Sequence, residues 1–173
     1  MTEKVLVSYA SKYGSTAEIA QEITQQLQKR GISATLLPVD EVSDLEEYSA
    51  VILGSAVYAG QWRKPAADFL KDRAGELAAR KVWLFSSGPT GAGKPEDIMN
   101  GWRFPENLQP AADQIQPQET AFFHGALEEE KLGFAEKLIV KGLKAPLGDY
   151  RDWERISGWA AEIADQLRKN GQV

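Results

Sequence analysis

Residues 5–16 read VLVSYASKYGST, and the rest of the chain is best understood from this stretch. Val5–Tyr9 is a mainly apolar run, which predicts a buried strand. A turn follows at Ser11–Thr16, and Ala17–Lys29 then repeats apolar residues every four positions, which predicts an amphipathic helix. A buried strand that passes through a short turn into a helix is the repeating unit of a parallel α/β sheet.

The same alternation of strand and helix signals continues along the chain. Each later strand signal is a short apolar run, typical of strands buried on both faces. The alternation predicts a parallel sheet with helices on both faces. The four further strands are predicted at Ala34–Val39, Ala50–Gly54, Val82–Phe85 and Thr120–His124.

The helix signals are of uneven strength. Ser43–Glu46 is typical of a capped short turn of helix, and Lys64-Pro65 opens a helix with proline where its missing N–H is harmless. Gly88–Pro117 is rich in Gly and Pro, and it predicts a long loop around a helix. Leu127–Leu143 is predicted as an extra helical segment. The last helix begins after Asp152 and is expected to align Trp153, Ile156, Ala160, Ile163 and Leu167 on one face.

Composition limits the chemistry that is available. The chain has 173 residues, which suits a single domain over 1–173. It has no cysteine and one histidine, His124, so thiolate chemistry and histidine-cluster metal sites are excluded and no metal is expected. A net charge of −5 argues against a nucleic-acid partner. No export signal or span of ~20 apolar residues is visible, so we expect a cytoplasmic protein.

The turn after the first strand carries the most specific signal. A helix N-terminus presents free N–H groups and a partial positive charge, which together bind anions. Hydroxyl groups and a glycine in the same turn suit a terminal phosphate. The alternative is a plain turn in which Ser and Thr only cap the helix. The candidate phosphate-binding residues are Ser11, Lys12, Tyr13, Gly14, Ser15 and Thr16.

Two other loops are expected at the same edge of the sheet, because ligands of doubly wound sheets bind beyond the carboxyl ends of the strands. Gly54–Lys64 carries Tyr58 and Trp62, which could stack on a flat ring. Ser86–Gly91 is small and polar, and could approach a ligand closely. One loop suited to a phosphate and two suited to an aromatic ring indicate a mononucleotide with a large planar ring system.

These residues and their order resemble the flavodoxin family over nearly the whole chain. Ser11 stands where threonine is usual in that family, and Lys12-Tyr13 fill the middle of the loop. The resemblance implies a flavodoxin-like, three-layer α/β sandwich with a doubly wound five-stranded parallel sheet of order 2-1-3-4-5. It also implies non-covalent FMN, whose ring would be flanked by Ala56, Val57, Tyr58, Ala59 and Gly60, and by Ser87, Gly88, Pro89, Thr90 and Gly91.

A closer resemblance is to the flavodoxin-domain group that includes menaquinone-dependent protoporphyrinogen dehydrogenase. Leu132–Leu143 looks like the extra helix of that group, and Asp152-Trp153 looks like the pair that opens its last helix. The resemblance implies an FMN-dependent oxidoreductase that uses a small-molecule donor, such as a porphyrinogen, and an acceptor such as a quinone. No side chain is expected to act as a catalytic acid or nucleophile, since the cofactor carries the chemistry.

Two other functions stay open at this stage. One is a flavodoxin-type carrier that shuttles single electrons between redox proteins, although such carriers tend to be more acidic. The other is a binding module that kept the fold and lost the flavin. A Gly88–Lys94 match to the Walker pattern is set aside, because Pro95 replaces the required Ser or Thr.

Two further features each have two interpretations. His124 could shuttle a proton, or could simply form a hydrogen bond at a strand end. The helix at 127–143 places Lys137, Lys141 and Lys144 beside an apolar face. It could pack on the core, or residues 132–144 could make a peripheral contact at the inner face of a membrane or with a partner.

Overall fold

The central sheet of the computed structural model, which describes residues 3–171, has the predicted order. Its five long strands all run parallel, in the order β2-β1-β3-β5-β6. Two short antiparallel pairs lie outside this path: β4 pairs with β3, and β7 pairs with β8. The strands are β1 Lys4–Ala10, β2 Ser33–Pro38, β3 Ala50–Tyr58, β4 Gln61–Trp62, β5 Lys81–Ser87, β6 Glu119–Phe123, β7 Ala126–Leu127 and β8 Gly148–Asp149.

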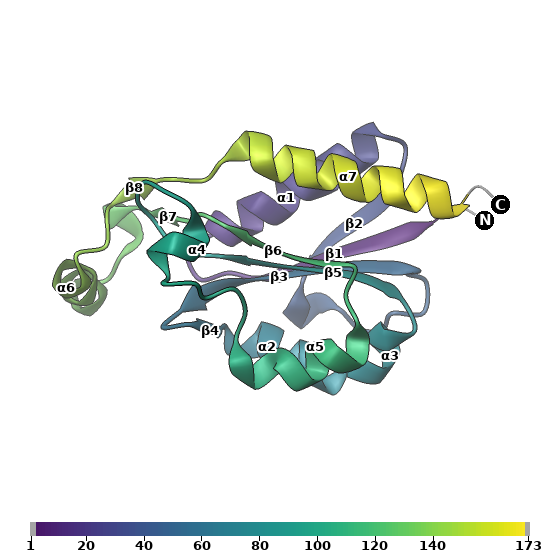
Figure 1. Ribbon diagram of the computed structural model, residues 1–173, viewed down its shortest axis with the longest axis horizontal. Coiled ribbons are helices and arrows are strands. Elements are labelled where there is room, and N and C mark those ends of the chain that lie inside the picture. Colours follow the sequence, from purple (N-terminus) through teal and green to yellow (C-terminus); the bar gives the residue numbers. More distant parts are fainter. Residues whose placement is uncertain (1–2, 172–173) are drawn as a thin grey trace.

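Helices cover both faces of this sheet, as Figure 1 shows. One layer contains α1 (Ser15–Lys29) and α7 (Trp153–Gly171). The other contains α2 (Lys64–Asp72), α3 (Ala74–Ala78) and α5 (Gln109–Ile115). The remaining elements are η1 Val39–Glu41, α4 Pro95–Ile98, η2 Glu106–Leu108, η3 Glu129–Lys131 and α6 Phe134–Leu143.

The two hydrophobic cores follow from the alternation of side chains along each strand. On β1, Val5 and Val7 face α1 and α7, while Leu6 faces α2, α3 and α5. Close packing is visible between β3 and β5, where Gly54 lies opposite Phe85. A Cβ at position 54 would stand 2.0 Å from the Phe85 ring, so only glycine leaves room for that ring.

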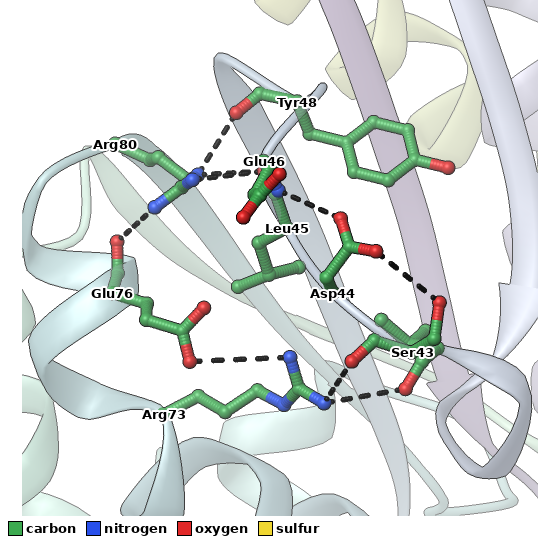
Figure 2. Close-up of polar contacts among 9 residues, drawn as sticks. Ser43, Asp44, Leu45, Glu46, Tyr48, Arg73, Glu76 and Arg80 are labelled. Atoms are coloured by element: carbon green, nitrogen blue, oxygen red, sulfur yellow. Dashed lines mark hydrogen bonds and ion pairs between the residues drawn. The ribbon is translucent and has the colours of Figure 1, made fainter.

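The prediction of a helical turn at Ser43–Glu46 is wrong. The carboxylate of Asp44 instead accepts a hydrogen bond from the backbone N–H of Glu46, at 3.0 Å, and forms an Asx turn. The segment is attached to the helices by two arginines, shown in Figure 2. Arg73 donates to the carbonyl of Ser43, at 2.9 Å. Arg80 donates to the carbonyls of Leu45 and Tyr48.

The segment before the last helix also differs from its prediction. It is helical only over Phe134–Leu143, and not from Leu127, because β7 and η3 occupy the residues before it. The expectation that this helix packs on the core is wrong, because α6 has no buried residue. Of the face predicted for α7, Trp153 is more than one-third exposed, while Ile156, Ala160, Ile163 and Leu167 are buried.

Candidate functional site

The loop between β1 and α1 leaves the first turn of the helix open to an anion. Gly14 is the N-cap residue of α1 with φ at +92°, and no side chain caps the helix there. The Ser11 hydroxyl accepts a hydrogen bond from the Gly14 N–H at 3.1 Å and closes the turn. No atom lies within 4 Å of the position that a Cβ on Gly14 would take. The loop therefore has free N–H groups beside open space.

The loop at 87–91 meets this first loop. The hydroxyl groups of Thr16 and Ser87 lie 2.8 Å apart, in a buried hydrogen bond. Gly88 lies against β3, since a Cβ there would stand 3.2 Å from the carbonyl oxygen of Val57. Pro89 and Thr90 are buried, while Gly91 is half-buried. The predicted loops at 11–16, 56–60 and 87–91 are thus brought together at the carboxyl ends of β1, β3 and β5.

The loop at 56–60 is the tip of a tight hairpin between β3 and β4. Ala59 and Gly60 have φ values of +50° and +73°, so both central residues of the turn are left-handed. Ala56 is buried and Val57 half-buried, whereas Tyr58 is 40% exposed. Burial of the rest of its ring raises the pKa of the Tyr58 phenol, against the opposing effect of Lys12 and Arg63. The hairpin therefore holds one neutral aromatic ring at the edge of the site.

Tyr58 and Tyr13 form an aromatic corner beside the candidate phosphate loop. Their ring centroids are 6.5 Å apart in an edge-to-face arrangement. The Lys12 ammonium lies 5.2 Å from the centroid of Tyr13 and 5.6 Å from that of Tyr58. The hydroxyl group of Tyr13 is buried and has no hydrogen-bond partner among the described residues. Such a group usually has a partner, so the Tyr13 hydroxyl is available to a polar ligand.

Arg151 is the residue that sequence reasoning missed. Its side chain is only 4% exposed and donates to the backbone carbonyl of Ser15 at 3.1 Å. It also lies 3.4 Å from the carboxylate of Glu18 and makes two hydrogen bonds to Asp149. This pairing lowers the pKa of the Asp149 carboxyl and raises that of Arg151. Because Arg151 lies 136 residues from Ser15, no local pattern could have identified this contact.

Trp62 does not contribute a stacking face, so that expectation is wrong. Its side chain is 5% exposed, its indole N–H donates to the Ser86 hydroxyl at 2.8 Å, and its ring packs against Phe104. A different tryptophan lies near the hairpin. A Cβ on Gly60 would stand 3.4 Å from Nε1 of Trp102, which packs against Phe122.

The remaining polar candidates have structural roles. His124 Nε2 lies 2.7 Å from the carbonyl oxygen of Gly93, which confirms the hydrogen-bonded interpretation of this residue. Asp152 accepts a hydrogen bond from the backbone N–H of Arg155 and caps α7, and Asp149 forms a turn with the N–H of Arg151. A hollow along β6 and α7 is lined by Phe123, Trp159 and other residues, none of which belongs to the three loops.

The fold and the three converging loops define a nucleotide-binding protein of the flavodoxin type. Residues 6–153 match the flavodoxin domain family, so the chain belongs to that family. Its cofactor is FMN, and its activity is that of a flavoprotein oxidoreductase or electron carrier. The five-stranded order predicted from the resemblance is confirmed by this match and by the sheet.

The chain is similar to particular proteins of known name. It is 25% identical to the protoporphyrinogen IX dehydrogenase [quinone] of Escherichia coli K12, over 93% of this chain and 94% of that protein. Its structure resembles a flavodoxin of Streptococcus pneumonia TIGR4, with a TM-score of 0.61, 18% identity, and coverage of 94% and 99% of the two chains. It also resembles Flavodoxin 1 of Bacillus cereus, with a TM-score of 0.60, 17% identity, and coverage of 94% and 98%.

The residues present fit FMN. A phosphate needs free donors and space, and both exist beside Gly14. The unpartnered hydroxyl of Tyr13 and the ammonium of Lys12 supply a further donor and a positive charge in the same loop. A flat ring needs an aromatic neighbour, and Tyr58 is the exposed aromatic residue of the hairpin.

Proposed function

We propose that this chain is an FMN-dependent oxidoreductase that takes electrons from a small organic donor and passes them to a quinone-like acceptor. In this proposal, residues 11–16 bind the phosphate through backbone N–H and hydroxyl groups. Residues 56–60 and 87–91 flank the isoalloxazine ring. Bound FMN supplies the electron transfer itself, so the chain binds and orients its cofactor and limits the access of water.

The observation that carries the proposal is the extent of the similarity to the quinone-linked dehydrogenase of E. coli. It covers nearly all of both chains, so it extends beyond the elements that any flavodoxin-type sheet would share. A porphyrinogen-type donor follows from the same similarity. The single-electron carrier is the competing function, and the modest net charge of −5 gives it less support.

The first test is a visible absorption spectrum of the purified protein, followed by identification of the cofactor that heat releases. Steady-state reduction of a series of quinones then separates the two functions. An enzyme saturates with one preferred quinone and is reduced by protoporphyrinogen without oxygen. A carrier reduces all quinones slowly and without preference, and exchanges electrons rapidly with a redox protein.

No helix within residues 3–171 combines the length and the apolar character needed to cross a bilayer. A quinone acceptor would still be met at a membrane surface when it carries a long isoprenoid tail. The proposed function therefore raises the question of which surface of this chain could approach lipid.

A further inference from the structure

α6 presents an uncovered apolar surface. Figure 1 shows the helix standing off one end of the sheet, away from both helical layers. Phe134 is 82% exposed, Ile139 61% and Leu143 74%, and Leu138 is also mostly exposed. Leu147, in the loop that follows the helix, is also exposed. Single exposed apolar residues are ordinary, but a contiguous set of them marks an interaction site.

The helix has a clear inner and outer side. Glu136 and Val140 are its half-buried residues, one turn apart, so this side faces the protein body. Leu138 lies opposite this side, with Phe134 next to it, whereas Ile139 and Leu143 lie along one flank of the helix. All four side chains are nevertheless mostly exposed, so neither the outer side nor this flank is covered by the described part of the molecule.

The charges beside this apolar face identify the partner. Lys137 and Lys141 lie one turn apart along its flank, and Lys144 ends the helix. None of the three has a carboxylate within 4.0 Å of its ammonium group among residues 3–171, whereas Glu136 is paired with Lys12 at 3.0 Å. An apolar face flanked by unpaired lysines matches the acyl chains and anionic headgroups of a lipid surface. In a second copy of α6, by contrast, the same lysines would repel one another.

We propose that α6 docks this protein on an anionic membrane surface, with Phe134, Leu138, Ile139 and Leu143 in the outer acyl region and the lysines among the headgroups. The helix has only ten residues, so it lies in the interface and does not span the bilayer. The acidic residues Glu129 and Glu130 precede the helix, so its lysine-bearing C-terminal half lies nearer to the anionic headgroups.

The docked helix also places the candidate flavin site near lipid. Glu136 on the inner side of α6 is paired with Lys12 of the phosphate loop, so α6 and that loop are neighbours. A lipid-soluble quinone would then reach the flavin without leaving the membrane surface. This part of the inference rests on the proposed function, and it identifies the membrane surface as the place where the quinone acceptor would reach the protein.

The test is co-sedimentation of the full-length, FMN-loaded protein with vesicles of phosphatidylcholine, with or without phosphatidylglycerol. We expect binding only to the anionic vesicles, and release by high salt. The L138Q/I139Q variant should lose binding, and K137Q/K141Q should weaken it by roughly 25-fold, at about fivefold per lysine. Neither pair is buried, so both variants should keep the wild-type melting temperature and FMN affinity.

The matched control is K29Q, which removes one exposed lysine from the last turn of α1 and should bind vesicles as the wild type does. Absence of wild-type binding to anionic vesicles overturns the proposal, and so does undiminished binding by L138Q/I139Q. A dimer in sedimentation velocity that L138Q/I139Q dissolves, without vesicle binding, would assign the face to a second copy instead. Reduction of a water-soluble quinone without vesicles tests the proposed function separately.

Discussion

The hydroxyl group of Thr16, at the start of α1, lies 2.8 Å from that of Ser87, at the end of β5, and both side chains are buried. The two residues are 71 positions apart, and their bond joins the candidate phosphate loop to a loop expected to flank the ring. We expect Thr16→Val to leave the Ser87 hydroxyl without this partner and to lower the free energy of unfolding by about 2 kcal/mol. FMN affinity, measured by fluorescence quenching, should fall roughly tenfold.

Thr24→Val is the matched control for this change. Thr24 is also buried in α1, but its hydroxyl donates to the carbonyl of Ala20 within the same helix. We expect this variant to bind FMN as the wild type does. Equal losses of FMN affinity in the two variants would mean that Thr16 acts only through the stability of the helix.

Gly14 and Gly31 lie at opposite ends of α1 and offer a matched pair of substitutions. Both have positive φ, and a Cβ on either would meet no atom within 4 Å. Gly14→Ala and Gly31→Ala should therefore each cost about 1 kcal/mol of stability through backbone strain. Only Gly14→Ala should weaken FMN binding, because its methyl group enters the space assigned to the phosphate. If isothermal titration finds the same FMN affinity in both, the phosphate lies elsewhere.

The Asp149–Arg151 pair predicts a change of stability in acid. Hydrogen bonds from Arg151 hold the pKa of Asp149 below its usual value. The stabilisation is therefore complete above the unfolded pKa of about 3.9 and is lost as the pH falls through the folded pKa. Asp149→Asn should reduce the loss of melting temperature between about pH 5 and pH 2. If the melting temperatures of wild type and variant fall equally as the pH is lowered, the prediction is contradicted.

Arg80 should matter for stability and not for the flavin. Its guanidinium donates to the carbonyls of Leu45, Tyr48 and Glu76 (Figure 2). Tyr48 and Arg80 precede β3 and β5, whereas the loops at 56–60 and 87–91 lie at the other ends of these strands. Arg80→Gln should lower the free energy of unfolding in urea by about 2 kcal/mol, since buried acceptors lose their donors. Arg103→Gln, at an exposed arginine, is the control and should change little. A loss of FMN affinity in R80Q alone would show that this connection influences the site.

The sheet and the meeting of the three loops could be predicted because they depend on local signals and one general rule. Val5–Tyr9 and the helix after it are recognisable from their own residues, and parallel strands bring their carboxyl ends to one edge. Arg151 could not be predicted in this way. Its partners Ser15 and Glu18 lie near Arg151 only in the folded chain.

Two of the failed predictions share a physical cause. A sequence shows that an apolar side chain can be buried, but not what will cover it. This applies both to an aromatic residue in a loop, such as Trp62, and to an apolar helix face, such as that of α6. Trp62 is covered by Phe104 and the Ser86 hydroxyl, whereas nothing in residues 3–171 covers Phe134. At Ser43–Glu46 the Asx turn of Asp44 competed with a helix cap that uses the same residue types.

The ion pair between Lys12 and Glu136 would connect the two proposed binding events, of FMN and of a lipid surface, in one thermodynamic cycle. If FMN changes the position of Lys12, it changes the position of α6 as well, and with it the affinity of that helix for any surface. Reciprocity then requires the surface to change the affinity for FMN by the same factor. FMN titrations with and without vesicles, and vesicle titrations with and without FMN, should therefore give the same coupling energy. Exchange of Lys12 for a neutral residue should reduce that energy toward zero.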